Sequence, residues 1–187
     1  MRLKNRTLSL IIAISMVFSM FGILQNTGAS AEYTGPAKLS FSDLGEGNTF
    51  TIDLVCENTT GQDLAFNGAG LALVFEDPNK VSPEPQDGSC VSTTVNGFAD
   101  LGSDWLADSK MLKASVGNVT IEATIAANET KTLLSIKCKL IDTSVTYNEA
   151  GLSQYIKTDS SGSNGIGVQE NQALIGTDAV ALTFTWP

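Results

Sequence analysis

The chain has 187 residues and no histidine, and its 11 lysine and arginine residues stand against 20 aspartate and glutamate residues. The absence of His excludes a Ser-His-Asp triad, a Cys-His pair and any imidazole metal ligand. Both arginines lie among the first six residues, so the chain after residue 31 carries 8 lysines against 20 acids, a net charge of −12. Such an acidic chain is a poor candidate for binding nucleic acid or anionic lipid.

The N-terminal segment has the pattern of a secretory signal peptide. A basic start is followed by an uncharged apolar run from Leu8 to Leu24 and by small residues that end at Ala31. This pattern predicts cleavage between Ala31 and Glu32. The alternative is a membrane anchor, but the run is near the lower length limit for spanning a bilayer. We therefore expect a signal peptide at 1–31, one extracellular domain at 32–187 and no membrane span after cleavage.

Two early segments of the domain alternate between apolar and polar residues. In residues 50–56 every second side chain, including Leu54 and Cys56, is apolar, and residues 70–75 repeat the pattern through Leu73. Successive side chains of a strand point to opposite faces, so both segments predict strands with one apolar face. The polar residues between them, which include a glycine, predict a turn.

The rest of the chain predicts further short strands. We expect strands at residues 37–41, 89–95, 111–116, 119–125, 132–141 and 179–186. We expect a short helix or an ordered loop within 97–109, a short helix within 148–157 and a flexible loop at 160–165. Gly117-Asn118 predicts a hairpin between the two extended runs that it separates. Eight or nine strands with frequent turns and no long helix predict an all-β, antiparallel two-sheet β-sandwich with one or two short helices.

The three cysteines cannot all pair within the chain because their number is odd. Cys56 and Cys138 each lie on the apolar side of a predicted strand. If those strands face or neighbour each other, the two cysteines could form a disulfide. The alternative is that they are two buried, small apolar side chains. The sequence leaves both alternatives open.

Three aspartates are spaced four residues apart in the segment that we expect to form a short helix or an ordered loop. Asp100, Asp104 and Asp108 would make a ridge on a helix, and Ca²⁺ takes several hard oxygen ligands of this kind. The spacing does not match the usual calcium-binding loop, and a solvated acidic face is the alternative. Trp105 within the ridge is either a core anchor or an exposed platform for a sugar or a protein partner. No other cofactor is expected.

Four segments resemble, in order, the sequence blocks of cohesin modules. They are Gly47–Val55, Leu71–Val81, Gly117–Ile125 and Thr132–Leu140, and the resemblance covers about residues 45 to 141. It implies a nine-stranded jelly-roll sandwich that binds a dockerin module on one sheet face, without catalysis, in bacterial assemblies that degrade plant polysaccharide. The chain departs from the family at Glu76, which is inserted before Asp-Pro where the family has Tyr-Asp-Pro. No binding residue is therefore transferred from the family.

The sequence predicts a secreted, non-catalytic binding module, because no nucleophile with an adjacent base is recognisable. We expect a protein partner that resembles a dockerin. The alternatives are a carbohydrate-binding sandwich that takes a polysaccharide and a structural subunit of a surface or matrix layer. A flat sheet face without aromatic side chains would favour protein docking, and a row of exposed Trp and Tyr would favour carbohydrate. A detachable terminal strand would favour a structural subunit.

Overall fold

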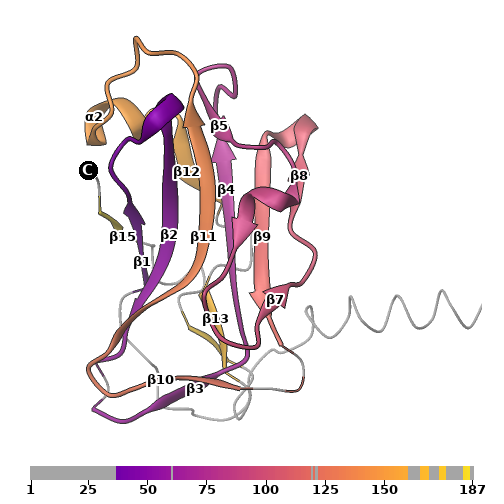
Figure 1. The fold of residues 1–187 in the computed structure, drawn as a ribbon, viewed down its shortest axis with the longest axis vertical. Coiled ribbons are helices and arrows are strands. Elements are labelled where there is room, and N and C mark those ends of the chain that lie inside the picture. Colours follow the sequence, from indigo (N-terminus) through magenta and orange to yellow (C-terminus); the bar gives the residue numbers. More distant parts are fainter. Residues whose placement is uncertain are drawn as a thin grey trace, which may run out of the picture. The chain divides into compact units, whose positions relative to one another are not determined.

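The computed structural model describes residues 37–59, 61–118, 120, 122–159, 165–168, 173–175 and 183–185 (Figure 1). All of them belong to the compact unit that extends from Tyr33 to Pro187. The predicted signal peptide at 1–31, with its cut between Ala31 and Glu32, lies outside the described residues, as does most of the predicted loop at 160–165. In the described part, no helix is long and apolar enough to span a membrane.

The first sheet is organised around β2 and β11, the two longest strands of the described part of the chain, which lie side by side (Figure 1). Its order is β15-β1-β2-β11-β5, with β6 also paired to β11. The pairs are antiparallel except β1 with β15, which is parallel. The strand bounds are Ala37–Phe41 (β1), Thr49–Glu57 (β2), Val81–Pro83 (β5), Val91–Ser92 (β6), Thr130–Leu140 (β11) and Thr183–Thr185 (β15).

The second sheet is centred on β4 and β9 (Figure 1). Its order is β14-β13-β4-β9-β7, with β12 also paired to β4 and β8 to β9, and all its pairs are antiparallel. The bounds are Gly68–Phe75 (β4), Ala99–Asp100 (β7), Asp104–Leu106 (β8), Met111–Gly117 (β9), Ile156–Thr158 (β12), Gly165–Val168 (β13) and Ala173–Ile175 (β14). The remaining elements are the pair β3 (Leu64–Phe66) and β10 (Ala123–Ile125), the helix α2 (Glu149–Leu152), and the 3-10 turns η1 (Glu46–Asn48), η2 (Gly88–Cys90) and η3 (Ala107–Ser109).

One buried cluster joins the inward side chains of both sheets. Leu54 on β2, Leu73 on β4 and Ile136 on β11 are all fully buried in it. These positions are the apolar-face residues of the alternating segments, so the period of two correctly identified the inward faces. The structure confirms the all-β class and the antiparallel two-sheet β-sandwich.

Of the two alternatives expected within 97–109, the short helix is wrong. This segment forms β7, β8 and η3 instead, and both strands pair with the edge of β9. Gly97 and Gly102 have φ angles of 81° and 104°, which a right-handed helix does not contain. The open edge of β9 supplies backbone hydrogen-bond partners to this segment. The segment is therefore extended, although its apolar residues recur at helical spacing. The second expected helix, within 148–157, is the single turn α2, followed by β12.

The hairpin expected at Gly117-Asn118 is also wrong. β9 pairs with β4 and β10 pairs with β3, so the strands on either side of the turn do not pair with each other. β3 and β4 are separated only by Asn67, whose carbonyl accepts a hydrogen bond from the Asn118 amide at 2.9 Å. The β3–β4 segment is thus the partner of both strands. The predicted strand at 89–95 is shorter than expected, since only Val91–Ser92 pair.

Candidate functional site

The three aspartates of the predicted acidic ridge lie on three different elements. Asp100 is on β7, Asp104 on β8 and Asp108 on η3, and all three are exposed. Asp100 accepts hydrogen bonds from the backbone N–H and the hydroxyl of Ser103, so it stabilises its own loop. Within the described ranges, no three His, Cys, Asp or Glu side chains lie close enough together to hold a metal ion. The helical ridge that suggested Ca²⁺ does not form.

Trp105 is a core anchor rather than an exposed platform. In the register of β8 with β9 it lies opposite Leu112, which is fully buried and faces the core. Its ring makes an edge-to-face contact with Phe75, with 5.8 Å between ring centroids and an interplanar angle of 68°. The indole is half-buried and packs against the cluster between the sheets. Its ring therefore packs against the core and does not stand out from the surface as a platform.

Of the two alternatives for Cys56 and Cys138, the structure has two buried cysteines with no bridge between them. The register of β2 with β11 places Cys56 opposite Lys131 and Cys138 opposite Phe50. Phe50 and Cys56 are six residues apart on one strand, so the two cysteines are separated by roughly 20 Å. The third cysteine, Cys90, ends η2 and is also buried and free.

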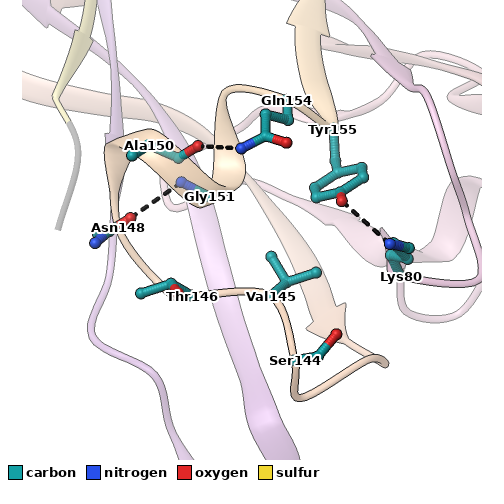
Figure 2. Close-up of a pocket in the computed structure, with 9 residues that line it drawn as sticks. All are labelled: Lys80, Ser144, Val145, Thr146, Asn148, Ala150, Gly151, Gln154 and Tyr155. Carbon is teal, nitrogen blue, oxygen red and sulfur yellow. Dashed lines mark hydrogen bonds between the residues drawn. The ribbon is translucent and has the colours of Figure 1, made fainter.

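A cavity of about 420 Å³ lies beside α2 (Figure 2). Lys80 Nζ donates a hydrogen bond to the Tyr155 hydroxyl at 3.2 Å and lies 4.0 Å from Asp142 Oδ2. The bond to Tyr155, with a smaller contribution from Asp142, raises the pKa of Lys80. The cavity is lined by Lys80, Ser144, Val145, Thr146, Asn148, Ala150, Gly151, Gln154 and Tyr155.

Several polar groups around this cavity already have partners. Asn148 Oδ1 accepts a hydrogen bond from the Gly151 N–H and so caps α2, and Gln154 Nε2 donates to the Ala150 carbonyl (Figure 2). No lining residue combines a nucleophile with an adjacent general base, because Lys80 stays protonated and the cavity has no carboxylate in its lining. The cavity has the groups to bind a small polar ligand and lacks those for acyl or phosphoryl transfer.

The outward side of the second sheet forms a broad surface across β12, β4, β9 and β8. The registers place Lys157, Val74, Met111 and Leu106 in one outward row. The three apolar members of this row are partly exposed, while their neighbours Leu73 and Leu112 face the core and are fully buried. The next row holds Ala72, which is buried, and Lys113 and Asp104, which are exposed. We call these seven residues the open face.

The open face carries charge at its margins. Beyond the second row the outward positions are Gly70 and Ser115, which are small. Lys113 is exposed, and Lys157 forms an ion pair with Glu76 at 2.7 Å. The hydrogen bond from Lys157 lowers the pKa of Glu76, so this carboxylate remains charged. No aromatic side chain belongs to the open face, and the large apolar residues most exposed elsewhere in the described chain are Leu44, Leu101 and Ile141.

Sequence reasoning missed the open face for a specific reason. The segment that contains Leu106 was expected to form a short helix or an ordered loop, so the pairing of Leu106 with Met111 could not be predicted. The signal that was available is the parity of β4, since Val74 lies between the inward Leu73 and Phe75 and must point outward. Which residues of other strands join Val74 depends on register, and the sequence does not reveal register.

The fold and the site together define a β-sandwich with one sheet face that mixes apolar and charged side chains. Its structure is similar to the seventh ScaB type I cohesin of Pseudobacteroides cellulosolvens, with a TM-score of 0.44 and 11% sequence identity over 80% of this chain and 88% of that one. It is also similar to a type II cohesin domain from the cellulosome of Acetivibrio cellulolyticus, with a TM-score of 0.40 and 16% identity over 81% of this chain and 93% of that one. No family model matches the sequence, and no curated protein matches it.

Proposed function

We propose that the protein is a non-catalytic module that docks another protein on the open face. The observation that carries this proposal is the outward row of Val74, Met111 and Leu106 on one sheet face, with Lys113, Lys157 and Asp104 around it. Protein interfaces typically combine a small apolar centre with a polar rim. A regular sheet also holds these side chains rigidly, which lowers the entropy cost of binding.

The absence of aromatic residues on the open face argues for protein rather than sugar. Carbohydrate-binding surfaces use aromatic rings as platforms, and Trp105 packs into the core instead. The partner class that we propose is a dockerin-like module, which rests on the four cohesin-like segments of the sequence. The setting is an extracellular or cell-surface assembly that degrades polysaccharide.

The cavity beside α2 supports a second candidate, the binding of a carbohydrate. It combines the Tyr155 ring and hydroxyl with the Lys80 ammonium and the amides of Asn148 and Gln154. Hydroxyl, amide and ammonium groups beside an aromatic ring are the kinds of group that recognise sugars. We rank this function second because the amides are already engaged in local hydrogen bonds.

Export is part of the proposal and has its own test. We propose that the chain is secreted and that its signal peptide is removed after Ala31, on the basis of the basic start, apolar run and small residues at the N-terminus. Mass spectrometry of protein from the culture medium should find Glu32 as the first residue. Protein in the medium that begins at Met1 would contradict this part of the proposal.

The docking proposal is tested by titrating the protein with dockerin modules from the organism that carries this gene, using calorimetry. Met111→Asp should weaken binding roughly 30-fold or more, because it places a charge at the centre of the apolar row. Ile141→Asp is the matched control, since Ile141 is 45% exposed and lies outside the open face, and it should bind like the parent.

Two results would overturn the docking proposal. One is equal binding by Met111→Asp and Ile141→Asp, which would remove the open face from the interface. The other is that no dockerin module binds while the protein is retained on cellulose, xylan or chitin. In that case Tyr155→Ala should abolish the retention if the cavity beside α2 is the sugar site.

A further inference from the structure

Two short strands meet the same edge of β11 at successive positions. On β5, Pro83 pairs with Cys138, and on β6, Val91 pairs with Ile136. The chain between Pro83 and Val91 leaves this edge and returns through η2, whose last residue is Cys90. Cys90 therefore re-enters the sheet directly beside the stretch of β11 that carries Cys138.

Both side chains point into the core at this place. Cys90 is 4% exposed and Cys138 is fully buried, and both belong to the same apolar cluster. Cys90 is one residue and Cys138 two residues from the facing pair Val91 and Ile136, whose Cα atoms lie about 4.5–5.5 Å apart, and a disulfide needs a Cα separation of about 4.4–6.8 Å. Cys90 departs from the β6 register in η2, because in register it would lie opposite the exposed Lys137 and point outward, whereas its side chain is buried. The two cysteines are thus neighbours, whereas Cys56 lies near the other end of β11, opposite Lys131.

The pKa of Cys138 agrees with a place for Cys90 in the same part of the core. Burial raises the pKa of Cys138 well above its usual value, and the second cause of that rise is charge on Cys90. Cys56 makes no such contribution to Cys138. The two sulfur atoms therefore share one apolar environment.

We propose that Cys90 and Cys138 are joined by a disulfide when the chain folds under oxidising conditions, and that Cys56 takes no part in this bridge. The oxidant is a disulfide-bearing compound, either a thiol–disulfide oxidoreductase or oxidised glutathione. One thiolate attacks the oxidant and forms a mixed disulfide with release of one thiol. The second thiolate then attacks that mixed disulfide and releases the other thiol, so two electrons and two protons leave the protein.

The bond forms while the loop at 84–92 is still open. Burial, followed by the charge of Asp87, raises the pKa of Cys90 to about 11 in the folded chain. The thiolate is the reactive form, so the folded, reduced protein reacts slowly. The bridge would close a loop of about 48 residues, from Cys90 to Cys138, and restrict the unfolded chain. We expect it to raise the melting temperature by on the order of 10 °C.

The test starts from the full chain, unfolded and reduced, and refolds it in a mixture of reduced and oxidised glutathione. The product is then denatured without reductant, alkylated and digested. The expected result is one alkylated cysteine, Cys56, and a peptide pair that links Cys90 to Cys138, with an intact mass lower by two hydrogens. Three alkylated cysteines, or a linked pair that includes Cys56, would overturn the proposal.

Matched variants distinguish the stability that comes from the disulfide from the stability that comes from packing the cysteine side chains in the core. Cys56→Ala should keep the linked peptide and the difference in melting temperature between the oxidised and reduced forms. Cys90→Ala should lose both, because no partner for Cys138 remains nearby. If Cys90→Ala keeps that difference, the stabilisation does not come from the bridge and the proposal fails. The result is independent of whether a dockerin binds, so the two proposals can fail separately.

Discussion

Asn58 is the best residue for testing how the end of the first sheet is joined to the β3–β10 pair. It follows β2 and is completely buried, although it is polar. Its Nδ2 donates hydrogen bonds to the carbonyls of Gln62 at 2.7 Å, Ile125 at 2.9 Å and Ala126 at 3.1 Å. Its backbone also bonds to Glu129 and Asn128. One amide therefore joins the end of β2 to the turn before β3 and to the turn between β10 and β11.

Asn58→Ala removes the amide and leaves buried carbonyls without donors. Each lost hydrogen bond costs about 1 kcal/mol, and each buried group left unsatisfied costs about 1–3 kcal/mol. The Ile125 carbonyl is in the most buried of the three bonds, and the other two are partly buried and can recover some bonding from water. The variant should therefore lose about 3–5 kcal/mol of unfolding free energy. Asn58→Asp keeps the shape but turns the donor into a charged acceptor facing three carbonyls, so it should lose more than Asn58→Ala.

Urea unfolding of each variant measures these losses of unfolding free energy. Each loss lowers the urea concentration at the unfolding midpoint and leaves the dependence of the unfolding free energy on urea concentration unchanged. Asn79→Ala is the matched control, because Asn79 is exposed and its side chain makes one long hydrogen bond, to Asp77 at 3.3 Å. The control should change stability by less than about 0.5 kcal/mol. Losses in Asn58→Ala and Asn79→Ala that agree within that margin would refute the reasoning, because the Asn58 amide would then contribute no net stability.

Two further predictions concern the core. Leu73→Ala removes a fully buried side chain of β4 and should cost about 2–5 kcal/mol in the same assay, and a loss below about 0.5 kcal/mol would mean that its face is wrongly assigned. Burial raises the pKa of Tyr147 to about 12 and of the reduced Cys90 thiol to about 11, from ordinary values of 10.0 and 9.0. The unfolded chain releases these protons first, so stability should be full below about pH 9 and should fall as pH rises toward 12. Tyr147→Phe and Cys90→Ala should each flatten that fall, and an unchanged slope in both would contradict the assignment.

The sequence by itself determined the inward faces of the long strands. A period of two is a local property of an extended chain, so the alternation around Leu54 and Leu73 identified buried side chains before any partner strand was known. Frequent turns and the absence of long helical patterns were enough for the all-β class and the two-sheet sandwich. The same local pattern in residues 132–141 correctly placed Ile136 in the core.

Only the tertiary structure decided which residues meet across strands. The segment around Trp105 was expected to be a short helix or an ordered loop because its apolar residues recur at helical spacing, but it forms β7 and β8 along the open edge of β9. Gly117-Asn118 has the composition of a hairpin turn, yet the flanking strands pair with β4 and β3. In both cases the segment pairs with a strand that is distant in the sequence and does not form the expected local helix or hairpin. The local sequence pattern contains no information about such distant partners.

The candidate sites depend on the same long-range pairing. The open face exists because register brings Val74, Met111 and Leu106 into one row from three strands. The shared apolar alternation of Cys56 and Cys138 left open whether they form a bridge, but the cysteine that a loop returns to the edge of β11 near Cys138 is Cys90. Local chemistry determines whether a side chain points inward, and register between distant segments determines what it meets there.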